Sequence, residues 1–188
     1  MATSAVFSAL AGAWTAGRPP VVLVDGGSGS GKSTLARSLV ARWTETRPGE
    51  TASLVRLDDM YPGWDGLEDA ARRLTDDVLA PLAAGEPARW RRWDWEAGAP
   101  AEWHSVDPGA ALVVEGSGAL SRASRALADL GVWVELDAAE RRRRAIARDG
   151  EVYEPHWDRW AAQEDRFVAR ENPDDVADVM IDGRTIAP

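Results

Sequence analysis

The segment Gly26-Gly27-Ser28-Gly29-Ser30-Gly31-Lys32-Ser33-Thr34 decides the fold of this chain. A short run of β-branched and apolar residues, 21–24, precedes it, and Leu35, Leu39 and Val40 follow it at helical spacing. The segment therefore has the pattern G-x-x-x-x-G-K-[ST] between a strand and a helix, which is the context that gives this pattern its meaning. The run 21–24 predicts a strand buried on both faces.

This pattern is that of a phosphate-binding loop, or P-loop. Its glycines let successive backbone N–H groups point inward as a nest for an anion, and the N-terminus of the following helix adds partial positive charge. We expect residues 26–34 to bind ATP, with Lys32 reaching the β- and γ-phosphates and the Ser33 hydroxyl holding Mg²⁺.

Lys32 is the single lysine among the 22 basic residues of the chain. Because arginine is a planar, bulky fork, it is a poor substitute for a compact ammonium group in such a loop. A guanine-reading Asn-Lys-x-Asp motif cannot occur elsewhere in a chain with no other lysine, so a GTPase is disfavoured.

The composition of the 188 residues excludes several classes of protein. The chain has no cysteine, which excludes a disulfide scaffold, a zinc–thiolate site and a cysteine nucleophile. Its net charge of −9 argues against general binding of nucleic acid. No apolar run approaches the ~20 residues of a membrane span, and the N-terminus makes a poor signal peptide. We expect a cytoplasmic protein.

Further apolar runs alternate with helical segments along the chain. Strands are predicted at 53–57, 111–114, 131–136 and 179–181, and helices at 67–82 and 138–148, whereas residues 1–18 are only loosely patterned. Alternation of this kind predicts an α/β fold of the P-loop NTPase type, with a parallel sheet of about five strands covered by helices on both faces. A single domain spanning residues 1–188 is expected.

Acidic residues follow three of these strands, at the end where ligands bind in such sheets. Glu115 follows four apolar residues and is a candidate magnesium ligand with Ser33; alternatively, it caps the next turn. Asp58 and Asp59 point to opposite sides of the chain, and we expect Asp58 to face the γ-phosphate. Asp25 is interpreted as structural.

Residues 86–108 predict an antiparallel hairpin inserted between strands, because Arg and Trp partly alternate up to Trp95 and a turn-like stretch follows. One interpretation is a hairpin packed by tryptophans, with arginines reaching to solvent. The other is a substrate wall, in which Trp93 stacks on the acceptor and Asp94 or His104 recognises its hydroxyls.

A capping box, Asp137 to Glu140, predicts the start of a helix that carries Arg141, Arg144 and Arg148 on one face. That face is either solvated or part of a lid, residues 138–160, that supplies positive charge to a transition state. The helical stripe Trp157, Trp160 and Glu164 is interpreted as packing.

In combination, these blocks resemble the uridine kinase-like branch of the P-loop small-molecule kinases, which includes phosphoribulokinase and bacterial pantothenate kinase. The resemblance rests on residues 26–34, 57–61, 93–95, 113–116 and 141–149, and spans 21–183. It implies that Asp58 is the base for the acceptor hydroxyl, that Tyr61 lines the acceptor site, and that Arg144 and Arg148 serve the lid. It also implies that adenine lies near residues 182–184, which include Arg184.

The departures from this family lie on the acceptor side. Trp93 stands where a tyrosine is usual, residues 96–98 replace a histidine, and Ala145 replaces a lid arginine. The residues therefore support ATP-dependent phosphoryl transfer more strongly than uridine or cytidine as the acceptor. We expect an ATP- and Mg²⁺-dependent phosphotransferase that acts on a hydroxyl of a small molecule, with a nucleoside or nucleoside-like acceptor expected first. The alternatives are a nucleoside monophosphate kinase, with Arg89, Arg91 or Arg92 facing a second phosphate, and a non-catalytic ATP-binding switch protein. Assembly into a homo-oligomer stays open.

Overall fold

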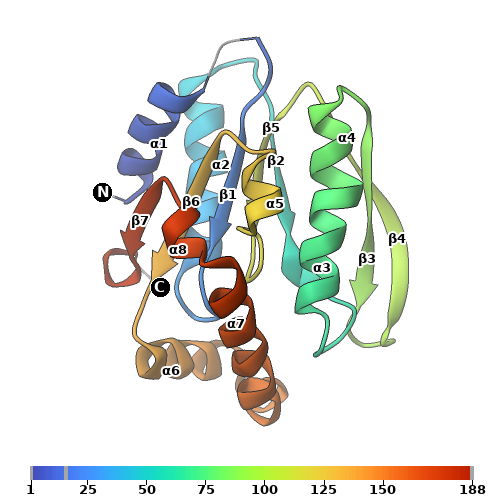
Figure 1. Cartoon of the computed structure of the whole chain (residues 1–188), viewed down its shortest axis with the longest axis vertical. Helices are drawn as coiled ribbons and strands as arrows, with labels where there is room; N and C mark the ends of the chain where they lie inside the picture. The colour runs from blue at the N-terminus through green and yellow to red at the C-terminus, as the bar shows by residue number, and fades with distance from the viewer. Residues whose placement is uncertain (1, 15–16, 187–188) are drawn as a thin grey trace.

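The structure is a computed structural model that describes residues 2–14 and 17–186. Five strands form one parallel sheet, in the order β2-β5-β1-β6-β7 (Figure 1). They are β1 (Val21–Asp25), β2 (Ala52–Arg56), β5 (Ala111–Glu115), β6 (Leu130–Glu135) and β7 (Val179–Asp182). The expected α/β fold is thereby confirmed, with β1 in the middle of the sheet and the P-loop at its carboxyl end.

Helices cover both faces of the sheet because the strand side chains alternate between them. On one face, Val22 and Val24 of β1 pack in a core with α1 (Ala2–Ala13) and α2 (Lys32–Thr46). On the other, Val21 and Leu23 pack in a core that includes α3 (Leu67–Arg73) and α7 (Trp157–Glu171). The short helix α5 (Arg122–Arg125) lies beside this second face (Figure 1).

Helix α1 corrects the expectation that residues 1–18 lack a pattern. Its sequence is rich in alanine, the strongest helix former, and it buries Val6 and Leu10, which lie four residues apart on one face. Two buried anchors among small residues make too weak a periodicity to predict a helix, yet they suffice to dock it against the sheet and Trp43 of α2.

The predicted helix at 67–82 is interrupted. Helix α3 continues into a π-helical stretch, Leu74–Leu79, and then into α4 (Ala80–Ala83). Pro81 has no N–H to donate to the preceding turn, which accounts for a break in the regular ladder here. The antiparallel hairpin of β3 (Ala88–Asp94) and β4 (Ala99–Val106) lies alongside this helical segment (Figure 1).

Helix α6 (Ala138–Asp149) begins where the capping residue predicts, because the Asp137 carboxylate accepts hydrogen bonds from Ala139 N and Glu140 N. Two 3₁₀ turns, Gly150–Val152 and Glu154–His156, lead from it into α7. Short elements complete the chain: 3₁₀ turns at Leu57–Asp59 and Gly183–Thr185, and α8 (Pro173–Val176).

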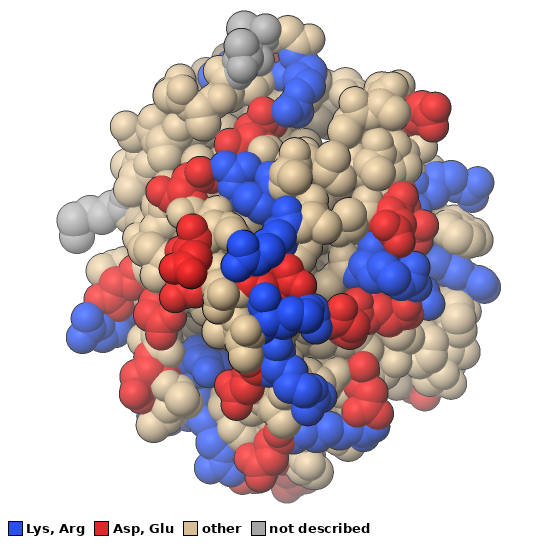
Figure 2. All heavy atoms as spheres, viewed as in Figure 1, with Lys and Arg blue, Asp and Glu red and all other residues tan. Residues whose placement is uncertain are grey.

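Arginines on α7 pair with acidic residues near the start of α3. Arg170 pairs with Glu68 at 2.7 Å, and Arg159 pairs with Asp65. In Figure 2 a line of basic side chains runs down the middle of this face, with acidic side chains on both sides of it.

In residues 2–14 and 17–186, no helix is long and apolar enough to cross a membrane.

Candidate active site

The P-loop joins β1 to α2, and its conformation requires glycine. Gly29 and Gly31 have φ of 83° and 101°, in the left-handed region that side chains other than glycine rarely adopt. Lys32, the first residue of α2, is 7% exposed, and its ammonium lies 3.4 Å from the Gly27 carbonyl oxygen. The ammonium therefore lies against the P-loop backbone, at the place where a bound phosphate is expected.

Ser33 and Glu115 come together as predicted for a magnesium site. The Ser33 hydroxyl donates to Glu115 Oε2 at 3.0 Å. The other oxygen, Oε1, is buried without a hydrogen-bond partner, and the nearest cationic atom is Nε of Arg56 at 3.5 Å. Burial raises the pKa of Glu115, whereas the charge of Lys32 opposes this shift. An unsatisfied buried carboxylate oxygen beside a hydroxyl fits a hard cation that takes its remaining ligands from phosphates and water.

Asp25 has the structural role that its position predicts. Its buried carboxylate accepts hydrogen bonds from the backbone N–H groups of Gly26, Gly118 and Leu120, at 2.6 to 3.2 Å. Burial raises the pKa of Asp25 to about 7, although these hydrogen bonds and Lys32 act in the opposite direction. Asp25 thus ties the start of the P-loop to the loop that follows β5.

One cavity of about 480 Å³ extends from the P-loop to an aromatic wall. Ser28, Lys32 and Ser33 line it on the P-loop side. The residues that line the rest come from five other parts of the chain, namely Asp58, Tyr61, Trp64, Trp95, Ser117, Arg148, Asp149, Val152, Tyr153 and Trp160. A phosphate donor and an organic acceptor can therefore meet in one space.

The aromatic wall is built around Trp64. Its ring stacks on Tyr153 at 5.4 Å between centroids and meets Trp95 at 5.0 Å and Trp160 at 6.5 Å. These four residues were not predicted as site residues, because each lies in a different element or loop and the sequence does not show that these elements meet. The one available signal was the interleaved tryptophans of the hairpin, of which Trp95 reaches the cavity.

The two adjacent aspartates separate as expected, because only Asp58 lines the cavity. The Asp58 carboxylate is 44% exposed and lies 3.6 Å from Arg56, while its backbone carbonyl accepts a hydrogen bond from Trp95 Nε1 at 2.9 Å. The hairpin end is therefore fixed to the Asp58 backbone. Asp59 is half-buried, and burial raises its pKa.

Trp93 and Asp94, predicted as substrate residues, do not line this cavity. The Asp94 carboxylate is used within the hairpin turn, where it accepts from Glu96 N and Ala97 N and pairs with Arg92. His104 stacks on Trp90 and lies 3.3 Å from Glu102. The hairpin tryptophan that does line the cavity is Trp95, two positions beyond Trp93.

The arginines of α6 diverge. Arg148 lines the cavity and pairs with Asp149 at 2.6 Å. Arg144, predicted with it, is instead bound to Glu140 and to the carbonyl oxygen of Gly183, at 2.8 and 3.0 Å. The two residues share one face of α6 but lie one turn, about 5.4 Å, apart along its axis. Arg144 therefore reaches Gly183, whereas Arg148 reaches the cavity.

Arg184 lies outside the cavity, with its guanidinium paired to Asp182 and its side chain 79% exposed. It lines a second hollow of about 500 Å³ with Glu135, Asp137 and Glu140. The loop after β7 nevertheless abuts the P-loop, because a Cβ on Gly183 would lie 2.5 Å from the Ser30 carbonyl oxygen. Adenine near residues 182–184 stays a prediction.

Tyr61 lines the cavity, yet its hydroxyl is already used: it donates to the Ser117 carbonyl oxygen at 2.8 Å, and the ring is 2% exposed. Replacing Tyr61 by phenylalanine should therefore lower the free energy of unfolding by about 1 kcal/mol, the net contribution of a typical hydrogen bond. Urea denaturation measures this loss. A variant with unchanged stability and a raised KM for the acceptor would instead assign the hydroxyl to acceptor binding.

The chain is similar in sequence to two curated uridine kinases. The uridine kinase of Deinococcus deserti is 32% identical over 147 residues, which cover 70% of this chain and 69% of that protein. The uridine kinase of Brevibacillus brevis is 29% identical over 148 residues, covering 71% and 67%. The chain matches no protein-family model.

A solved structure described as a possible uridine kinase from Bacillus stearothermophilus has the same fold, with a TM-score of 0.70, 21% identity, and coverage of 96% and 97% of the two chains. Fold and relatives together define a P-loop small-molecule kinase, an ATP-dependent phosphotransferase. Within that class, the chain belongs to the uridine kinase family.

Proposed function

We propose that this kinase transfers the γ-phosphoryl group of MgATP to a hydroxyl of a nucleoside or nucleoside-like acceptor. The observation that carries the proposal is the shared cavity, where Lys32 and Ser33 line the same space as Asp58 and the aromatic wall. Its volume of about 480 Å³ suits a small molecule. Flat indole faces favour a planar ring by stacking.

Each lining residue has a role that its chemistry supports. Asp58 accepts the proton of the acceptor hydroxyl, and Lys32 and Arg148 stabilise negative charge on the transferred group. Ser33 and Glu115 would hold Mg²⁺, which when bound would neutralise charge on the phosphates. In this proposal residues 1–188 act as one kinase domain, with 86–108 as the acceptor-side insert and 138–160 as the lid.

A nucleoside monophosphate acceptor is less well supported, because a second phosphate would call for a further cation in the cavity. The three hairpin arginines are used on the hairpin. Arg89 and Arg91 lie over the ring of Trp103, at 5.3 and 5.8 Å, and Arg92 pairs with Glu102 at 2.6 Å. Arg148, which does line the cavity, is assigned in this proposal to the transferred phosphoryl group and is therefore not a further cation.

The test is release of ADP from MgATP across a panel of nucleosides, nucleoside monophosphates, pantothenate, sugars and other hydroxylated small molecules. A Lys32→Ala variant serves as the blank. Release that depends on a nucleoside supports the proposal, and release that depends on another class of acceptor overturns its acceptor. Tight ATP binding without acceptor-dependent turnover on any compound would favour the switch protein.

Trp95 tests the aromatic wall. Replacing it by alanine should raise the KM for the acceptor by roughly 5- to 150-fold, since stacking of a base on an aromatic ring contributes about 1–3 kcal/mol. The matched control is Trp103→Ala, because Trp103 lies on the same hairpin, is 55% exposed and does not line the cavity. Steady-state kinetics at saturating MgATP measure both. Equal effects of the two substitutions would remove Trp95 from the acceptor site.

A further inference from the structure

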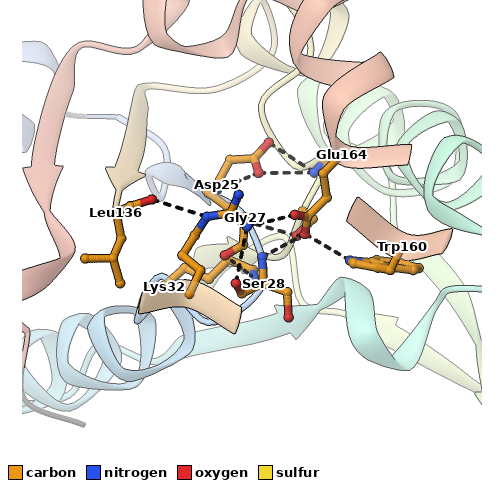
Figure 3. A network of polar contacts seen from close by, with 11 residues as sticks. Asp25, Gly27, Ser28, Lys32, Leu136, Trp160 and Glu164 are labelled. Atoms are coloured by element: carbon orange, nitrogen blue, oxygen red, sulfur yellow. Dashed lines mark hydrogen bonds and ion pairs between the residues drawn. The ribbon is translucent and has the colours of Figure 1, made fainter. Parts of the chain in front are cut away.

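Glu164 of α7 is a buried carboxylate that the proposed reaction does not use. Its side chain is 6% exposed. Oε1 accepts three hydrogen bonds, from Ser28 N at 2.7 Å, Ser117 Oγ at 2.8 Å and Trp160 Nε1 at 2.9 Å. Oε2 accepts from a guanidinium N–H of Arg141 at 3.0 Å. Figure 3 shows the carboxylate between Trp160 on one side and Gly27 and Ser28 on the other.

These four donors belong to different parts of the site. Ser28 belongs to the P-loop, Ser117 to the loop after β5, Arg141 to α6 and Trp160 to α7 itself. A charge taken out of water is costly unless it is paired and fully hydrogen-bonded. The carboxylate therefore favours the one arrangement in which all four donors reach it, and so it fixes the P-loop relative to both helices.

Arg141 extends this contact over the P-loop. Besides pairing with Glu164, its guanidinium donates to the carbonyl oxygens of Leu136 at 3.2 Å and Ser28 at 3.4 Å. A Cβ on Gly27 would collide with this guanidinium. Arg141 and Glu164 thus hold both the N–H and the C=O of Ser28, on a backbone whose neighbouring N–H groups are expected to bind phosphate.

Trp160 extends the same contact to the acceptor side. Its indole lines the cavity and meets the ring of Tyr61 edge-on, with 4.6 Å between centroids. Oε1 of Glu164 therefore accepts hydrogen bonds both from a backbone N–H of the P-loop, that of Ser28, and from the indole N–H of Trp160 in the aromatic wall.

We propose that Glu164 is a positioning residue, which acts with Arg141 to hold the P-loop in its ATP-binding conformation and in a fixed position relative to the aromatic wall. This inference rests on the proposed function, because it requires that the P-loop bind MgATP. The interpretation of the stripe Trp157, Trp160 and Glu164 as packing holds for Trp157, which is a core residue. Glu164 instead accepts four hydrogen bonds from four parts of the chain.

The experiment compares Glu164→Gln with Asp158→Asn, a control on the same helix whose side chain is exposed. Glutamine keeps the size of glutamate, but it has one acceptor oxygen and an amide donor. That donor must face either Arg141 or the group of Ser28, Ser117 and Trp160. We expect Glu164→Gln to raise the Kd for MgATP, measured by calorimetry well below the melting temperature, by about tenfold or more. Asp158→Asn should bind as the wild type does.

The KM values for ATP and for the acceptor are a second readout, because replacing a residue that only stabilises the fold would leave both KM values unchanged. Glu164→Gln should raise KM for both ATP and acceptor, whereas Trp160→Phe, which keeps a ring but removes the N–H donor, should raise KM for the acceptor alone. A Glu164→Gln variant with a lowered melting temperature and an unchanged Kd for MgATP would overturn the proposal.

Should Glu164→Gln fail to fold, Arg141→Gln decides, because it removes the same contact from the more exposed side, where Arg141 is 16% exposed. A raised Kd of Arg141→Gln for MgATP supports the proposal that Glu164 and Arg141 hold the P-loop, and an unchanged Kd overturns it. Where both single variants fold, the double variant should bind MgATP no more weakly than the weaker single variant, since the pair acts as one unit. Absence of MgATP binding by the wild type would reject the proposed function itself, which keeps the two failures distinct.

Discussion

Replacing Lys32 by alanine should lower kcat for acceptor-dependent ADP release by at least about 10²- to 10³-fold, the loss that follows removal of one preorganised donor to a developing charge. Lys32 is the only lysine of the chain and lines the cavity, and among the described residues its ammonium has one long hydrogen bond, 3.4 Å to the Gly27 carbonyl oxygen. Its charge is therefore available to a phosphate. The measurement is steady-state kinetics with a thermal melt to show that the variant is folded.

The informative partner is Lys32→Arg, which keeps the positive charge. Because guanidinium is planar and larger than ammonium, and because Lys32 is only 7% exposed, we expect this variant to lose most of its activity as well. A Lys32→Arg variant with wild-type kcat would show that charge alone is needed, and would contradict the explanation for the single lysine. A fully active Lys32→Ala variant would remove Lys32 from catalysis.

The sheet and the P-loop could be predicted because their signal is local. Residues 21–34 carry a strand, a turn and a helix start in consecutive positions, and Gly29 and Gly31 of that turn have backbone angles that only glycine adopts easily. Ser33 and Glu115 were predicted as partners because Glu115 directly follows a run of four apolar strand residues. The structure brings them together because β5 lies beside β1 in the parallel sheet and both strands end at the same edge.

The aromatic wall could not be predicted in the same way, because it depends on tertiary packing. Trp64, Trp95, Tyr153 and Trp160 belong to four different elements or loops, and the sequence does not show that these meet around one cavity. Trp93 and Trp95 have similar neighbours in the sequence, yet only Trp95 lies beyond the end of β3, where its indole can reach the Asp58 carbonyl.

Glu164 shows the same limit for a charged residue. At helical spacing from Trp157 and Trp160, it has the pattern of a residue that borders a packed face. Its polar contacts become visible only in the structure, where Ser28, which lies 136 residues earlier in the chain, donates a hydrogen bond to it. Burial of a carboxylate is the exception to the usual exposure of glutamate, and a sequence pattern does not record burial.

Replacing Asp58 by asparagine should lower kcat by roughly 10²- to 10⁴-fold, the contribution usual for a general base, and leave the Kd for MgATP unchanged. Asparagine keeps the shape of the side chain but cannot accept the hydroxyl proton. The exposed pair with Arg56, at 3.6 Å, contributes little to stability, so the variant should melt as the wild type does. Its kcat, measured at saturating acceptor, reports the chemical step.

The matched control is Asp59→Asn, because Asp59 is adjacent but does not line the cavity. If the base assignment is right, Asp59→Asn retains most of its kcat, and any effect is on stability, since Asp59 is half-buried near Arg56 and Arg92. Comparable losses in the two variants would mean that the acidic pair acts jointly. A large loss in Asp59→Asn alone would transfer the role of base to the other aspartate and require the acceptor to bind on the opposite side of the chain.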